Sequence, residues 1–214
     1  MISFNDPRFT YVYSSANLCN QALTEIYYLS CSVSTKEELD FVNGPPFAFY
    51  RVTLQYCYNS EYNKLFEKKL KINYPENHIA SVYNLNTFLK NTQKGFNEIY
   101  EQNLQLLIPL LNSPFYIKQR RLRDKKFSHS DMDEINDPLK IEGLTDQEIM
   151  EGFKHVKLIY QIINNCARYF DFEFSTRVPH EDDRTKNFIK FQAVYKKYYY
   201  KNYFKAINEG YNLF

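Results

Sequence analysis

Residues 145–170 have the sequence TDQEIMEGFKHVKLIYQIINNCARYF, and they carry the clearest signal for the class of fold. They open with a capping box, in which we expect Thr145 and Glu148 to accept hydrogen bonds from each other's backbone. Apolar residues then recur at helical steps: Ile149, Phe153, Val156, Tyr160, Ile163, Ala167 and Phe170. This spacing predicts a long amphipathic helix that ends near residue 171.

The rest of the chain shows helical spacing between strong breaks. The breaks fall at 43–46, 73–77 and 112–114, where Asn and Pro gather. We expect the other helices at 15–32, 46–70, 78–112, 115–127 and 184–209. Gly95 and Pro109 should bend or divide the segment over 78–112.

The first two of these helices have apolar positions that should face a core. In the helix over 15–32 these positions are Leu18, Ala22, Ile26 and Leu29. In the helix over 46–70 they are Phe49, Val52, Tyr56, Leu65 and Phe66. Residues 172–178 alternate in polarity and are compatible with a short extended piece.

Together these segments predict an all-α fold. No strand signals alternate with the helices, so a parallel α/β sheet is not expected. Short connections favour an antiparallel bundle of five to six helices. We predict a single domain over 1–214, with its core at about 15–171 and an extra C-terminal helix at about 184–210.

Composition narrows the class of protein. A net charge of +2 is too small to indicate a nucleic-acid or membrane partner by itself. The 20 Tyr and 18 Phe are explained mainly by coding bias in an AT-rich genome, with an aromatic-lined binding surface as the alternative. The first seven residues lack the features of a signal peptide, and no apolar run approaches a membrane span. We therefore expect a cytoplasmic protein, no membrane partner, and four reduced cysteines.

Several kinds of catalytic or binding site have no matching motif. The four histidines share no metal-binding spacing, and the acidic residues between 131 and 137 lack the glycine and terminal Glu of a calcium loop. A glycine-rich phosphate loop and a GxSxG motif are also missing. We expect no metal and no cofactor, and we interpret 129–144 as a solvated acidic loop.

One basic segment is chemically suggestive. Residues 119–131 have the sequence QRRLRDKKFSHSD, with three Arg and two Lys close to His129. A histidine can transfer a proton at neutral pH, and an arginine can hold a phosphate with two hydrogen bonds. Such a pair could cleave RNA, and Arg120, Arg121, Lys125 and Lys126 would add affinity for it. The alternative is a basic helix end with a capping histidine.

Helix geometry restricts how this segment can work. Residues six apart lie roughly 120° from a shared face, because each residue turns a helix by about 100°. Arg123 and His129 can therefore converge only where the helix ends or kinks between them. A second copy of the chain is the other way to complete such a site.

Residues 123–131 also resemble a known family. Arg123-Asp124-Lys125, followed by Ser128-His129-Ser130-Asp131 and a long amphipathic helix, is similar to the motif of the HEPN superfamily, and in particular of its AbiU-like abortive-infection branch. The resemblance extends loosely over about residues 15–171.

The resemblance implies a HEPN-like bundle that homodimerises, so that two motifs meet at the interface. Active members are metal-independent endoribonucleases, often toxins or phage-defence effectors, and some work with an antitoxin or a nucleotidyltransferase partner. It implies that His129 is the general acid/base, Arg123 the ligand of the phosphate, and Asp124 the residue that orients them. The alternative function is an inactive helical module that binds a partner protein or a nucleotide.

The predicted C-terminal helix lies outside this resemblance. Its lysines alternate with Tyr and Phe, which is typical of helices that bind single-stranded nucleic acid or an acidic membrane surface. The interpretation that we favour from the sequence is a packing or dimerisation helix with its lysines in solvent.

Overall fold

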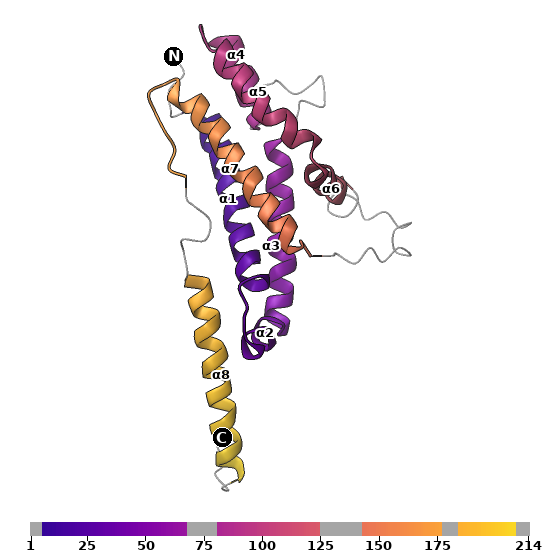
Figure 1. Ribbon diagram of the computed structural model, residues 1–214. Helices are drawn as coiled ribbons and strands as arrows, with labels where there is room; N and C mark the ends of the chain where they lie inside the picture. Colours follow the sequence, from indigo (N-terminus) through magenta and orange to yellow (C-terminus); the bar gives the residue numbers. More distant parts are fainter. Residues whose placement is uncertain (1–5, 68–80, 125–142, 177–183, 209–214) are drawn as a thin grey trace.

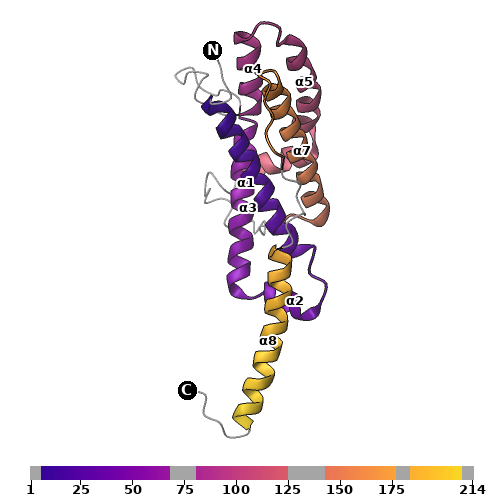
Figure 2. The ribbon, with the colours of Figure 1, turned by 90° about the vertical axis from the view of Figure 1, so that its left-hand side faces the viewer.

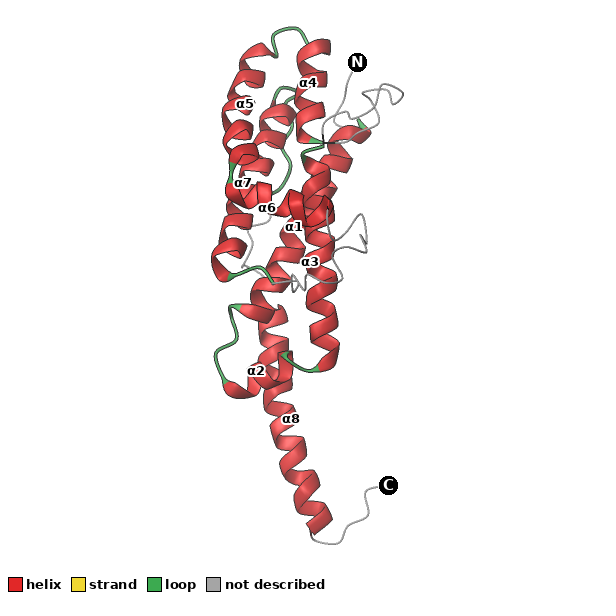
Figure 3. Ribbon diagram, turned by 90° about the vertical axis from the view of Figure 1, so that its right-hand side faces the viewer, coloured by secondary structure: helices red, strands yellow, loops and turns green. Residues whose placement is uncertain are grey.

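The computed structural model describes residues 6–67, 81–124, 143–176 and 184–208. In these ranges the chain forms eight helices and no strand (Figures 1 and 3). They are α1 (Pro7–Ser30), α2 (Lys36–Val42), α3 (Pro45–Leu65), α4 (Val82–Thr92), α5 (Asn97–Asn112), α6 (Pro114–Leu122), α7 (Asp146–Arg168) and α8 (Arg184–Asn208). The all-α class is confirmed, but the described residues contain more helices than the five or six predicted.

Helix α2 was missed because its seven residues are too few to show an apolar period. Its start nevertheless carries the same capping box as residues 145–148. The backbone N–H of Glu38 donates to Thr35 Oγ1 over 3.2 Å, and the backbone N–H of Thr35 donates to Glu38 Oε2 over 3.2 Å. At α7 the predicted box is present, with Glu148 N donating to Thr145 Oγ1 over 3.3 Å.

Helix boundaries also differ from the prediction in α1 and in the segment over 78–112. Helix α1 begins at Pro7 rather than near residue 15, because Asp6 accepts from the backbone N–H of Arg8 over 3.0 Å and caps the helix. The segment expected over 78–112 is divided into α4 and α5. Gly95 lies at the division and has a backbone φ of +87°, which residues other than glycine rarely adopt. Pro109 remains inside α5.

The core is built on the packing of α1 against α3 and α7 (Figures 1 and 2). Cys31, at the end of α1, donates to Asp146 at the start of α7 over 3.2 Å. At the opposite ends, the rings of Phe9 and Phe170 meet edge to face at 6.0 Å. These contacts show that α1 runs antiparallel to α7.

The apolar face predicted for α7 is confirmed. Phe170, just beyond the helix, is partly buried. The six predicted positions inside the helix are buried: Ile149, Phe153, Val156, Tyr160, Ile163 and Ala167. Each large apolar side chain removed from water contributes about 1.5–3 kcal/mol to folding. Burial of this face is therefore a main source of stability for the bundle.

The apolar faces predicted for the first two helices are partly wrong. In α1, Leu18 is 43% exposed although Ala22, Ile26 and Leu29 are buried. In α3, the side chain of Phe49 is 75% exposed, and Val52 and Tyr56 also face solvent. Leu65 and Phe66 are buried as predicted. The other buried residues of α3 are amides and tyrosines: Gln55, Tyr58, Asn59, Tyr62 and Asn63.

Helix α8 lies apart from the main bundle and projects beyond it (Figures 1 and 2). Its Ile189 and Ala193 are buried, and Ile189 shares an apolar cluster with Val42 of α2. Near its start, Thr185 donates to Glu25 of α1 over 3.0 Å. The extra C-terminal helix is thus attached mainly through α2.

Helix α7 comes very close to its neighbours at Gly152. A Cβ atom placed there would lie 3.0 Å from Cδ1 of Leu23 and 3.1 Å from the hydroxyl oxygen of Tyr58. Both distances are shorter than ordinary van der Waals contact. The glycine therefore permits α7 to approach α1 and α3 closely, although glycine is an unfavourable residue inside a helix.

We expect Gly152→Ala to lower the free energy of unfolding by up to about 2 kcal/mol. Overpacking costs about 1–3 kcal/mol, and the better helix propensity of alanine offsets about 1 kcal/mol of it. The measurement is urea unfolding followed by circular dichroism. Gly143→Ala is the matched control, because a Cβ there meets no atom within 4 Å. Equal stabilities of the two variants would contradict the proposed close approach.

Candidate anion-binding site at the end of helix α6

Helix α6 carries Arg120 and Arg121 of the basic segment over 119–131, and its capped start and a contact with α7 fix its position. At the start, the Ser113 hydroxyl accepts from the backbone N–H of Tyr116 over 3.0 Å, and Pro114 occupies the first turn. Phe115, Tyr116 and Gln119 are buried. In the middle of α6, Lys118 forms an ion pair with Glu148 of the α7 capping box.

A cluster of buried amides fixes the position of α6 on α3. The Asn59 amide donates to the Gln119 backbone oxygen over 2.8 Å and to Gln119 Oε1 over 2.9 Å. The Asn63 amide donates to the Asn59 backbone oxygen over 2.8 Å. All three side chains are buried, so breaking this cluster would leave polar groups unsatisfied. The register of α6 along α3 is therefore closely defined.

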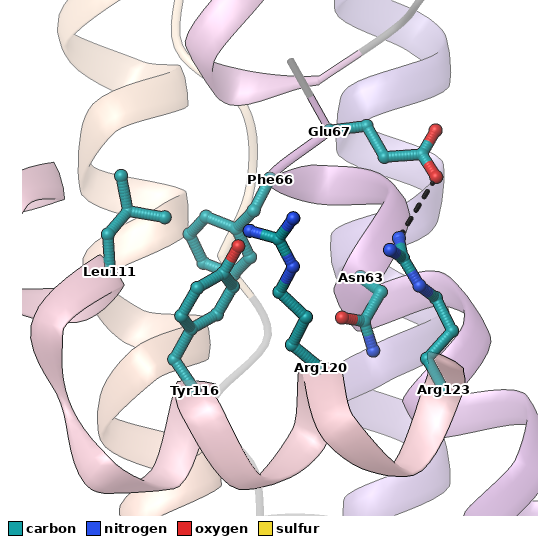
Figure 4. Close-up of a pocket in the computed structure, with 7 residues that line it drawn as sticks. All are labelled: Asn63, Phe66, Glu67, Leu111, Tyr116, Arg120 and Arg123. Carbon is teal, nitrogen blue, oxygen red and sulfur yellow. Dashed lines mark hydrogen bonds and ion pairs between the residues drawn. The ribbon is translucent and has the colours of Figure 1, made fainter. Parts of the chain in front are cut away.

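Arg123 lies at the C-cap of α6 and its guanidinium meets two carboxylates. Its Nε and Nη2 both lie 2.8 Å from Asp124 Oδ1, and its Nη1 lies 3.1 Å from Glu67 Oε1 (Figure 4). The side chain of Arg123 is only 21% exposed, which makes it the most enclosed of the basic groups here. Asp124, the next residue in the chain, and Glu67, just beyond the end of α3, thus hold the arginine in one orientation.

A pocket of about 230 Å³ lies beside Arg123 (Figure 4). Its lining combines two arginines with aromatic, amide and carboxylate groups: Asn63, Phe66, Glu67, Leu111, Tyr116, Arg120 and Arg123. Arg120 and Arg123 enter from α6, one turn apart, as the figure shows. Guanidinium groups placed in this way can bind a phosphate or another oxyanion.

The structure brings together three of the predicted site residues. Arg120, Arg123 and Asp124 are neighbours, since Arg120 Nε lies 3.9 Å from Asp124 Oδ2. Arg121 is exposed and does not line the pocket. His129, Lys125 and Lys126 lie outside the described residues. Helix α6 ends at Leu122, with Arg123 as its C-cap, and the break expected between Arg123 and His129 also lies outside the described residues.

The residues that α3 and the chain after it contribute to this site were not predicted from the sequence. Glu67 was expected inside a helix over 46–70, but α3 ends at Leu65 and places Glu67 opposite Arg123. Asn63 and Tyr116 were also not predicted to line a site. No local pattern marks these residues, because their role arises from contacts between segments about 50 residues apart.

His155 of α7 is a buried titratable group that packs against Tyr62 of α3. The Tyr62 hydroxyl is 2.5 Å from Nδ1 of His155, and Nε2 of His155 is 3.6 Å from Glu151 Oε1. Burial lowers the pKa of His155, while the nearby Glu151 carboxylate opposes this effect. His155 is 2% exposed and lines no pocket described here, so we assign it to the core rather than to the site.

Comparisons with known proteins give no further constraint. Neither protein-family models, nor curated protein sequences, nor solved structures match the chain. In the described ranges, no three His, Cys, Asp or Glu side chains gather as metal ligands would. No helix in those ranges has both the length and the apolar character needed to cross a membrane.

We expect His155 to make the stability of the protein depend on pH. In the unfolded chain this histidine gains a proton near pH 6.5, whereas burial resists protonation in the native state. The stabilisation is therefore complete above about pH 6.5 and is lost as the pH falls below it. The slope attributable to one such group is at most about 1.4 kcal/mol per pH unit.

Urea unfolding between pH 7.5 and 5 checks this expectation. The stability of His155→Gln should fall less steeply with pH than that of the wild type. Tyr62→Phe is the control, because it removes the hydroxyl bonded to the ring but leaves the histidine buried. Parallel pH curves for the wild type and His155→Gln would show that another group is responsible.

Proposed function

We propose that this protein is a metal-independent endoribonuclease of the HEPN type, in which Arg123 binds the scissile phosphate. The observation that carries the proposal is the enclosed guanidinium of Arg123 at the end of α6, beside a pocket that also contains Arg120. The sequence places a histidine, His129, six residues further along. This is the combination that the resemblance to the AbiU-like branch implies.

The proposed reaction follows from the residue types. His129 removes the proton from the 2′-hydroxyl, whose oxygen attacks phosphorus. The bond to the 5′-oxygen breaks as that oxygen takes the proton from the protonated His129. The products are a cyclic phosphate and a 5′-hydroxyl. Arg123 neutralises the charge that develops on the phosphoryl oxygens, and Asp124 fixes the orientation of its guanidinium.

The remaining roles follow the same proposal. Arg120, Arg121, Lys125 and Lys126 contact the RNA backbone. A second copy of the chain brings another motif to the site, and the biological setting is phage defence or a toxin–antitoxin pair. An antitoxin or a nucleotidyltransferase would be the partner that controls the activity.

RNA cleavage in the presence of EDTA tests the proposal. His129→Ala should lower the rate by about 10²–10⁴-fold, as for other positioned acid–base groups. Arg123→Lys should lower it by about 10²-fold, because a lysine cannot provide the forked hydrogen bonds of arginine. Arg51→Lys is the matched control, since Arg51 is on α3 and bonds to Asn43. Activity that requires a divalent metal, or that survives His129→Ala, refutes the proposal.

One observation favours a different function. Arg123 is already paired with Glu67 and Asp124, so any anion must compete with two carboxylates. A module that binds a nucleotide or an acidic segment weakly and reversibly would use such a site without catalysing a reaction. This function predicts binding to the pocket and no cleavage of RNA.

Both functions predict that Glu67 weakens anion binding. We expect Glu67→Gln to raise the affinity for a short RNA about two- to fivefold, because a partly exposed ion pair contributes about 0.5–1 kcal/mol. Fluorescence anisotropy with a labelled oligonucleotide measures the change. Glu61→Gln is the control, because Glu61 pairs with Lys64 on α3 and does not line the pocket. Identical affinities for the two variants would show that Glu67 does not compete with the ligand.

A further inference from the structure

Helix α8 has an exposed row of aromatic side chains that the proposed ribonuclease does not use. We call Phe188, Phe191, Tyr195, Tyr198 and Tyr199 the aromatic row. Their side chains are between 49% and 67% exposed, which is unusual for residues of this size. The rings of Phe191 and Tyr195 are nearly parallel, with centres 6.3 Å apart, and those of Tyr195 and Tyr199 are 6.2 Å apart. The helix therefore presents several flat rings to solvent in a regular series.

A lysine row runs along α8 beside the aromatic row, and consists of Lys186, Lys190, Lys197, Lys201 and Lys205. At about 100° per residue, each row occupies roughly 100° of the helix surface, and the two rows are adjacent. Ile189 and Ala193, which are buried, lie on the remaining side together with the exposed Lys196. The outward-facing surface of α8 is therefore aromatic along one edge and cationic along the other.

The charge of α8 excludes a second α8 as the natural partner of this surface. Its 25 residues include six Lys and one Arg, with no Asp or Glu. Pairing two such helices through their aromatic rows would bring like charges together with no carboxylate in either helix to compensate. The surface is complementary to an anion instead.

The aromatic row also distinguishes between kinds of anionic partner. Helices that lie in a membrane surface bury Trp, Phe and Leu in the lipid. Three of the five rings in the aromatic row carry a hydroxyl group, and the row contains no Leu, Ile or Trp. Single-stranded nucleic acid has a chain of phosphates on one side and flat bases on the other, which matches a lysine row next to a row of rings.

We propose that the outward surface of α8 binds single-stranded nucleic acid, with bases stacked on the aromatic row and phosphates paired with the lysine row. Lys197 now contacts Glu37 of α2 over 2.5 Å, but both side chains are largely exposed, so a phosphate can replace the carboxylate. The rings from Phe188 to Tyr199 extend over roughly 16 Å of helix, which is enough for several nucleotides. This binding does not require that the chain cleave RNA.

The test measures binding of the full chain to a labelled oligothymidine of about 12 nucleotides by fluorescence anisotropy. This probe has no 2′-hydroxyl and cannot undergo the proposed cleavage, so the result is independent of ribonuclease activity. Replacing both Phe191 and Tyr195 with Ala should weaken binding about tenfold or more. Replacing both Lys190 and Lys201 with Gln should reduce the slope of log affinity against log salt by about 1.4.

The control replaces Phe49 and Tyr56 with Ala, because these aromatic residues are also exposed but belong to α3. This variant should bind the oligonucleotide as the wild type does. Three results would overturn the proposal. In the first, the Phe191/Tyr195 variant keeps full affinity. In the second, the wild type binds phosphatidylserine vesicles but not the oligonucleotide. In the third, it binds neither and forms a dimer that the Phe191/Tyr195 variant dissociates.

Discussion

The contact of α7 with α1 and α3 is the interaction on which the rest of the bundle depends. It buries the apolar face of α7, and Gly152 allows the helices to approach until no space remains for a Cβ atom. The interior at this point also contains aromatic and polar groups, including the Tyr62–His155 hydrogen bond. Because Tyr62 of α3 is bonded to His155 of α7, the rotation of α3 about its axis is defined. The C-terminal end of α3 and the residues after it supply one side of the pocket.

The position of the candidate site follows from that rotation. Asn59 and Asn63 turn toward α6 and bond to Gln119, and this places Arg120 and Arg123 at the pocket. A basic segment alone would present flexible cations to solvent. Here a buried amide cluster, a capped helix start and two carboxylates restrict one arginine, so an arriving phosphate would meet a guanidinium whose orientation is already set.

The sequence was most informative where local signals and packing agree. The capping box and apolar spacing of α7 predicted a helix whose inner face is the one observed, and the breaks at 43–46 and 112–114 precede helices. Prediction failed for most of the inner face of α3, because up to Asn63 that face is made of Tyr, Asn and Gln, while Phe49 and Val52 face solvent. It also failed for Glu67, whose contact with Arg123 joins segments 56 residues apart. Local spacing carries no record of such pairs.

The position of α8 outside the main bundle affects how charge is distributed over the molecule. The whole chain has a formal charge of +2, and α8 alone carries +7, so the other residues together carry −5. Positive charge is therefore concentrated on the helix that projects from the bundle, although the chain as a whole is nearly neutral (Figure 2). In the field of a polyanion such a molecule experiences a torque and arrives with α8 foremost. At low ionic strength, orientation during approach would precede contact at any pocket.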